Sequence, residues 1–112
     1  RATAAESFEW YIRTSLRLLG SVATWQEGKE LGSYEYTRAL RDIDLNTLTF
    51  DVLDALDAVI VGDPDRCIAQ AKRYQQAGCD LLLCLMQPYK IPPHKVARSI
   101  ELIGKHVLPA FR

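Results

Sequence analysis

Apolar side chains in the first part of the chain recur every three or four positions, which is the spacing of an amphipathic helix. This pattern predicts one long helix from Ala4 to about Thr24. The positions of this stripe are Phe8, Tyr11, Ile12, Ser15, Leu16, Leu19 and Val22 or Ala23, which are apolar except for Ser15. The next stretch, Gln26 to Ser33, contains two glycines and has no periodicity, so we expect a loop there.

Shorter patterns fill the region up to residue 57. Tyr34 to Leu40 is compatible with a short helix, and Asp42 to Asn46 is typical of a turn that leads into a second helix. From Thr49 to Leu56, apolar residues at positions 50, 53 and 56 predict that helix. We expect Asp51 and Asp54 to form its solvated, acidic side.

Two apolar runs flank one amphipathic pattern between Ala58 and Met86. Ala58 to Val61 is a β-branched run, and Leu81 to Leu85 is an unbroken apolar run. Such runs are typical of parallel strands that are buried on both faces. Pro64 to Ala77 has the spacing of a helix, so the region predicts a strand, a helix and a second strand.

The ends of that helix carry their own signals. Asp63 is placed to cap the first free N–H groups, and Pro64 suits the first helical position. Gly78 is placed to end the helix. A helix N-terminus can also bind an anion, but the carboxylate of Asp63 already occupies that position, so we favour the capping role.

The last part of the chain predicts a loop from Gln87 to Pro92 and a helix that begins at Pro93 and ends at Pro109. The order of strand, helix, strand and helix predicts an α/β fold with a parallel sheet. Two parallel strands would leave both sheet edges unpaired. We therefore expect this region to be the closing part of a larger α/β assembly.

Composition and charge restrict the class of protein. The chain has 112 residues, of which 48% are apolar and 25% are charged, and its net charge is +0. This balance is typical of a globular domain and excludes the broad positive surface of a nucleic-acid or membrane-surface binder. No run is long enough to span a membrane and no leader peptide is apparent, so we expect a cytoplasmic protein. The chain begins with Arg1 rather than Met, so we expect further sequence upstream.

The three cysteines, Cys67, Cys79 and Cys84, are widely spaced and odd in number. Neither a disulfide framework nor a Cys-x-x-Cys metal site is indicated. We expect reduced thiols in the core.

Three strings of this sequence resemble, in order and spacing, the C-terminal part of luciferase-like monooxygenases. They are VGDPDRCI at Val61 to Ile68, AGCD at Ala77 to Asp80, and SIELI followed by VLPAFR between Ser99 and Arg112. Members of that family carry a V-G-x-P-E-type turn, a G-x-D-type turn into the last barrel strand and a closing helix that ends in V-x-P. The likeness covers about residues 58–112.

The resemblance implies an α/β fold, as the C-terminal fragment of a TIM (β/α)8 barrel with two parallel strands and flanking helices. Residues 1–57 would be a helical segment, and residues 58–112 the terminal β-α-β-α unit of one incomplete domain. The parent enzyme would be a homo-oligomer that uses O2 and a reduced flavin, either FMN or a deazaflavin, to oxidise a small organic substrate. In that family the catalytic and flavin-phosphate residues lie upstream of the matched strings. We therefore expect no catalytic residue here, and neither activity nor flavin binding from this chain alone.

In a barrel, the active site lies at the C-terminal ends of the strands. The candidates for a flavin or substrate pocket are then Met86, Gln87, Pro88 and Tyr89, which follow the second apolar run. The amide and the phenol could hydrogen-bond a flavin edge or a substrate. A loop that only turns the chain would look the same, so both interpretations stay open.

Other polar residues favour structural roles. His94 and His106 lie too far apart on the last helix to bind one metal ion, and we expect both at the surface. Asp51, Asp54 and Asp57 could hold a cation, but a hard cation needs more oxygen ligands, so we predict no metal site. The competing hypothesis for the whole chain is a non-catalytic self-association or interaction module, derived from the barrel tail, that pairs through its strand edges and its aromatic first helix.

Overall fold

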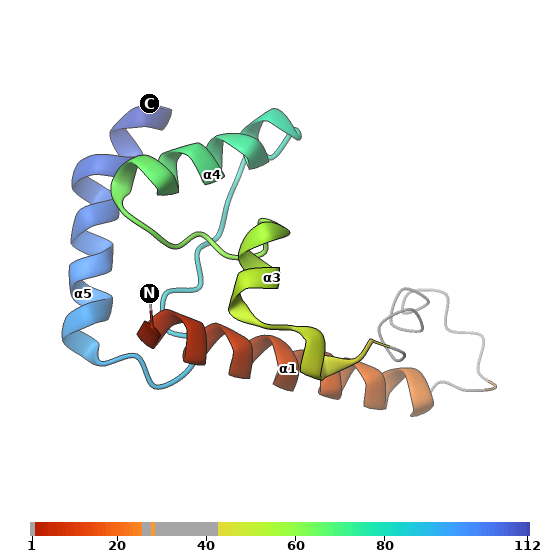
Figure 1. Ribbon diagram of the computed structural model, residues 1–112. Coiled ribbons are helices and arrows are strands. Elements are labelled where there is room, and N and C mark those ends of the chain that lie inside the picture. The colour runs from red at the N-terminus through yellow and green to blue at the C-terminus, as the bar shows by residue number, and fades with distance from the viewer. Residues whose placement is uncertain (1, 26–27, 29–42) are drawn as a thin grey trace.

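The computed structural model describes residues 2–25, 28 and 43–112, and the regular structure within them is helical throughout. Figure 1 shows α1 and α4 on two sides of the molecule, with α5 along a third side. The elements are α1 (Ala2–Trp25), the 3₁₀ turn η2 (Leu45–Thr47), α3 (Phe50–Ala55), α4 (Pro64–Gln76), α5 (Pro93–Leu102), the π-helical turn η3 (Ile103–Val107) and the 3₁₀ turn η4 (Leu108–Phe111).

The core is small and lies where α3 meets α1. Phe50, Leu53 and Val59 form the buried cluster, with 4%, 3% and 3% of their surface exposed. Phe8 and Ile12 of α1 pack against this cluster, as the helical spacing of the first pattern predicts. The long first helix is confirmed, and its bounds extend slightly beyond the predicted range.

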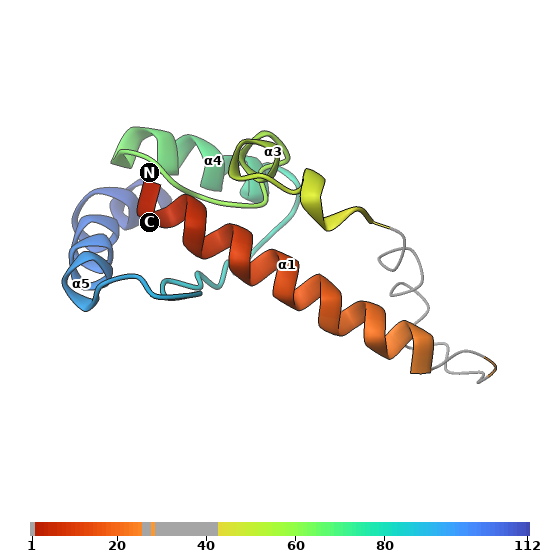
Figure 2. The same cartoon turned by 60° about the horizontal axis from the view of Figure 1, so that its bottom comes forward.

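Polar side chains of α1 hold the segment before α3. The carboxylate of Glu9 accepts a hydrogen bond of 2.6 Å from the backbone N–H of Phe50. Arg13 donates to the carbonyl oxygens of Leu45 and Leu48, each at 3.1 Å. These contacts satisfy backbone groups that the ends of short helices leave free. α1 therefore contributes both apolar packing and hydrogen bonds to the region of η2 and α3. Figure 2 shows the course of α1 beneath this region.

The predicted α/β fold, a TIM barrel fragment with two parallel strands, is wrong: the described residues contain no β-strand. Residues 58–61 and 81–86 are non-helical, but no backbone hydrogen bond joins them in this part of the chain. A sheet requires such a ladder. In the first segment, the carbonyl of Val59 and the N–H of Val61 bond instead to the side chain of Gln70.

The second segment also differs from a buried strand in its exposure. Leu81, Leu83 and Leu85 are 76%, 84% and 50% exposed. In Figure 1 the segment runs from the end of α4 through the middle of the view to the loop that precedes α5. The prediction that this apolar run is buried on both faces is therefore wrong.

The ends of α4 match their signals. The carboxylate of Asp63 accepts a 2.9 Å hydrogen bond from the N–H of Arg66, and Pro64 occupies the first turn. Gly78 follows the helix with a φ of +94°, a conformation that glycine adopts without strain. The capping role of Asp63 is confirmed.

Other predicted elements need correction or fall outside the description. The last helix begins at Pro93 as predicted. Helical turns continue past Pro109 through η4, so the predicted end at Pro109 is wrong. A proline near the start of a helical turn is tolerated, because it lacks only an N–H that would be unpaired there. The expected turn near residue 44 is the cap of η2, formed by Asp44. The expected loop over 26–33, apart from Gly28, and the expected short helix over 34–40 lie outside the described residues.

Candidate functional site

The loop that follows Met86 is closed by its own side chains. Gln87 accepts a 3.0 Å hydrogen bond from the N–H of Ile91, and its amide nitrogen donates to the carbonyl of the same residue. Both ends of the Gln87 side chain are therefore used within the loop. This arrangement holds the turn that connects the extended segment to α5.

Tyr89, in the same loop, packs on the first helix. Its ring lies parallel to that of Trp10, with 4.1 Å between the centroids and 10° between the planes. Lys90 has its ammonium group 5.1 Å from the Tyr89 centroid, and a hydrogen bond with Tyr89 raises the pKa of Lys90. The tyrosine thus attaches the loop to α1.

These contacts give both residues a role within the loop. The Gln87 amide bonds to Ile91 and the Tyr89 ring is stacked on Trp10. Their role in a flavin or substrate pocket stays a prediction. Met86 differs from them, because it is half-buried and lines a cavity of about 190 Å³ together with Phe8.

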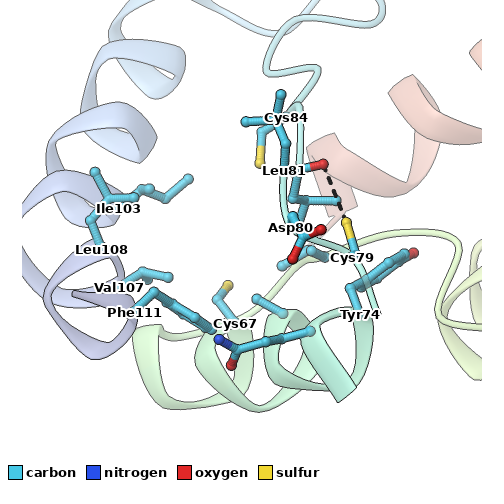
Figure 3. Close-up of a pocket in the computed structure, with 14 residues that line it drawn as sticks. Cys67, Tyr74, Cys79, Asp80, Leu81, Cys84, Ile103, Val107, Leu108 and Phe111 are labelled. Atoms are coloured by element: carbon cyan, nitrogen blue, oxygen red, sulfur yellow. Dashed lines mark hydrogen bonds between the residues drawn. The ribbon is translucent and has the colours of Figure 1, made fainter. Parts of the chain in front are cut away.

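A cavity of about 320 Å³ lies between α4, the second extended segment and the final helical turns (Figure 3). Its walls are mostly apolar, with Tyr74 and Phe111 among them. The Tyr74 hydroxyl is already engaged, since it donates to the backbone carbonyl of Asp57. The cavity is suited to an apolar group and offers few polar contacts.

All three cysteines line this cavity, and all are free thiols (Figure 3). Burial, together with the carboxylate of Asp63, raises the pKa of Cys67, which makes its thiolate less available. Cys79 lies 3.2 Å from the carbonyl oxygen of Leu81, to which its thiol donates. Cys84 is exposed, so the expectation that all three thiols lie in the core is wrong for this residue. The group has no feature of an activated nucleophile.

A buried amide at the centre of α4 was not found from the sequence. Gln70 is 1% exposed and donates to the carbonyl of Val59 at 3.0 Å and to the carboxylate of Asp54 at 3.1 Å. Its oxygen accepts from the N–H of Val61 at 3.2 Å. The Gln70 amide therefore makes hydrogen bonds with the backbone of residues 59 and 61 that a neighbouring strand would make in a sheet.

Two arginines of α4 extend this network. Arg66 donates to the carboxylate of Asp54 at 2.6 Å and to the carbonyl of Val61 at 3.1 Å. Arg73 pairs with the carboxylate of Asp57. The Asp54 side chain is only 9% exposed, so the prediction that it lies on a solvated face is wrong. The helical spacing of positions 66, 70 and 73 was a usable signal, because it places three polar groups on one side of α4.

The remaining candidates are the two histidines of the last helix and the acidic residues near α3. His94 and His106 are exposed, as expected. Within residues 2–25, 28 and 43–112, no group of three or more His, Cys, Asp or Glu side chains is placed to hold a metal ion. Over the same residues, no helix is both long and apolar enough to cross a membrane.

Comparisons with family models, with curated proteins and with solved structures gave no match.

Proposed function

We propose that this chain is the C-terminal portion of a flavin-dependent luciferase-like monooxygenase, which oxidises a small organic substrate with O2 and reduced FMN or a deazaflavin. Three strings support the proposal by their order and spacing, at 61–68, 77–80 and 99–112. The turn at Asp63 and the helix end at Gly78, which belong to the first two strings, have the local geometry expected of them. In this proposal the isolated chain is inactive.

The observation that carries the proposal of a larger functional unit is the exposure of the second extended segment. Leu81, Leu83 and Leu85 present adjacent apolar side chains to solvent. Contiguous apolar surface of this kind marks an interaction site in a stable protein. The segment therefore has the properties of a surface that another part of an enzyme, or another subunit, covers.

The contribution of the described residues is structural. Gln87 and Tyr89 hold the loop before α5, and Gln70 holds residues 58–61 on α4. The flavin would supply the activation of O2, and no step of the oxidation is assigned to a residue of this chain.

The test is the intact mass of the protein in its native source, captured with an antibody against the exposed face of α4. We expect a product clearly larger than 12.7 kDa that oxidises reduced flavin in the presence of O2. A native product of 12.7 kDa that neither binds nor oxidises flavin would contradict the proposal.

A non-catalytic self-association module is the second candidate, and the same exposed leucines favour it. It predicts a native product of 12.7 kDa that is an oligomer in solution. Mass and oligomeric state together therefore distinguish the two functions.

A further inference from the structure

We propose that Cys67 and Cys84 form a redox-sensitive pair, in which oxidation by a peroxide links the two thiols as a disulfide and attaches residues 81–86 to α4. The first support is the place of the two thiols among the cavities. Both Cys67 and Cys84 line the cavity of about 320 Å³ and the cavity of about 190 Å³, whereas Cys79 lines only the larger one. The two thiols of the pair therefore lie where the two cavities adjoin.

The second support is the direction of the two side chains. In Figure 3 the Cys67 sulfur faces the larger cavity from α4, and the Cys84 sulfur faces it from the extended segment. The Cys84 thiolate is also among the charges that raise the pKa of Cys67, after burial and the carboxylate of Asp63. The two sulfurs are thus close enough to interact.

The third thiol has a different partner. Cys79 donates to the carbonyl oxygen of Leu81 at 3.2 Å, a bond that Figure 3 also shows. Along the chain, Cys79 is much nearer to Cys84 than Cys67 is. Because short loops close most readily, an unfolded chain would favour a link between Cys79 and Cys84. A link between Cys67 and Cys84 therefore depends on the fold and not on sequence spacing.

A disulfide requires the Cα atoms of its two cysteines to come within about 7 Å of each other. Helix α4 fixes Cys67, but the extended segment has few contacts to lose. Within the described residues, the N–H groups of 82–86 donate no hydrogen bond. Leu81 and Leu83 are 76% and 84% exposed. The approach is therefore a movement of Cys84 toward α4 that breaks few interactions.

The more accessible thiol reacts first. Cys84 is exposed, whereas burial makes the Cys67 thiolate less available. The Cys84 thiolate attacks one oxygen of hydrogen peroxide, the O–O bond breaks, and the departing hydroxide takes up a proton to become water, which leaves a sulfenic acid on Cys84. The Cys67 sulfur then attacks the Cys84 sulfur, the S–O bond breaks, and hydroxide leaves with the Cys67 proton as water. Two thiols are oxidised to one disulfide, and the peroxide is reduced to two molecules of water.

The test treats the reduced, dilute 112-residue chain with hydrogen peroxide near the ordinary thiol pKa of about 8.5. Mass spectrometry then measures the intact mass and, after the free thiols are blocked, the disulfide-linked peptides. We expect the mass of the single chain to fall by two hydrogen atoms, and the linked peptides to contain Cys67 and Cys84. Dithiothreitol should reverse the change.

Two variants form a matched pair, because each leaves Cys84 with one other thiol. Cys79→Ser should form the internal link as fast as the unchanged chain, and Cys67→Ser should form it at least about tenfold more slowly. In guanidinium chloride the order should reverse, since the shorter loop then closes more readily. Unchanged helical circular dichroism establishes that both variants fold.

Three outcomes would overturn the proposal. They are linked peptides that contain Cys79 instead of Cys67, a link that forms only between two chains, and equal rates for the two variants in the folded chain. The peptides of the unchanged chain decide the pairing without any substitution. The pairing does not rest on the proposed flavin chemistry, because the peroxide is added, so either proposal can fail while the other holds.

Discussion

Residues 58–61 and 81–86 have similar apolar sequences and different surroundings. In the first segment, Val59 is 3% exposed and belongs to the core. In the second, Leu83 is 84% exposed. Neither segment pairs with the other in the described structure, so the difference does not come from a sheet.

The difference comes from polar side chains that meet the backbone. Gln70 donates to the carbonyl of Val59 and accepts from the N–H of Val61. Arg66 donates to the carbonyl of Val61. Burial of a backbone group without such a partner costs free energy, and partners of this kind remove that cost. The described structure provides no equivalent side chain beside residues 82–85. Of the two apolar runs, the one whose backbone groups are satisfied by side chains is the one that contributes a residue, Val59, to the core.

The largest effect should come from Gln70→Leu. This change leaves the carbonyl of Val59 and the N–H of Val61 without partners, so we expect a loss of about 2–4 kcal/mol in the free energy of unfolding. The control is Gln76→Leu, an exposed position on the same helix, with an expected change below about 0.5 kcal/mol. Denaturant unfolding followed by circular dichroism measures both. Equal losses would show that the amide does not hold the first segment.

The next prediction compares one side chain from each segment. Val59→Ala should cost about 2 kcal/mol, because it removes buried methyl groups from the core. Leu83→Ala, measured in dilute solution, should cost less than about 0.5 kcal/mol, since Leu83 is mostly exposed. The same unfolding experiment tests both. If Leu83→Ala cost as much as Val59→Ala, the second segment would be buried in solution.

A smaller effect is expected at the junction between the first segment and α4. Asp63→Ala removes the cap on the N–H of Arg66, and we expect a loss of about 1 kcal/mol. Asp65→Ala is the control, because Asp65 lies in the same first turn and forms no cap. A loss for Asp65→Ala that matched the loss for Asp63→Ala would mean that charge near the helix end, and not the hydrogen bond, stabilises α4.

The smallest expected effect is a difference in the rates at which two thiols are chemically labelled. Cys84 should react with iodoacetamide faster than Cys67 near the ordinary thiol pKa of about 8.5. Cys84 is exposed on the second segment, whereas burial raises the pKa of Cys67, so less Cys67 thiolate is present at that pH. As the pH rises above that value, ionisation of Cys67 stabilises the unfolded state more than the folded state, because the pKa of Cys67 is raised in the folded state. The free energy of unfolding should therefore fall. Mass spectrometry of peptides measures both rates, and a faster Cys67 would contradict the placement of the two thiols.

Local signals allowed much of the helical structure to be predicted. The first helix follows from its spacing, and the ends of α4 follow from Asp63, Pro64 and Gly78, because caps and helical proline act through neighbouring residues. The helical turn around Pro109 was missed because a proline that ends one helix can also begin the next turn.

The contacts across the chain were not predictable in the same way. Periodicity identified both apolar runs, but it does not tell whether a strand or a side chain will meet their backbone groups. Gln70 was assigned no role, since a glutamine on a polar helix face is usually solvated. For the candidate site, the residue types of Gln87 and Tyr89 are compatible with ligand binding, and the sequence does not show that these side chains also contact Ile91 and Trp10.

Residue-resolved hydrogen exchange tests the central claim most directly. We predict that the N–H of Val61 is protected, because the side-chain oxygen of Gln70 accepts its hydrogen bond. The N–H groups of 82–86 donate no hydrogen bond within the described residues, so they should exchange freely. Protection of residues 82–86 equal to that of Val61 would contradict the account.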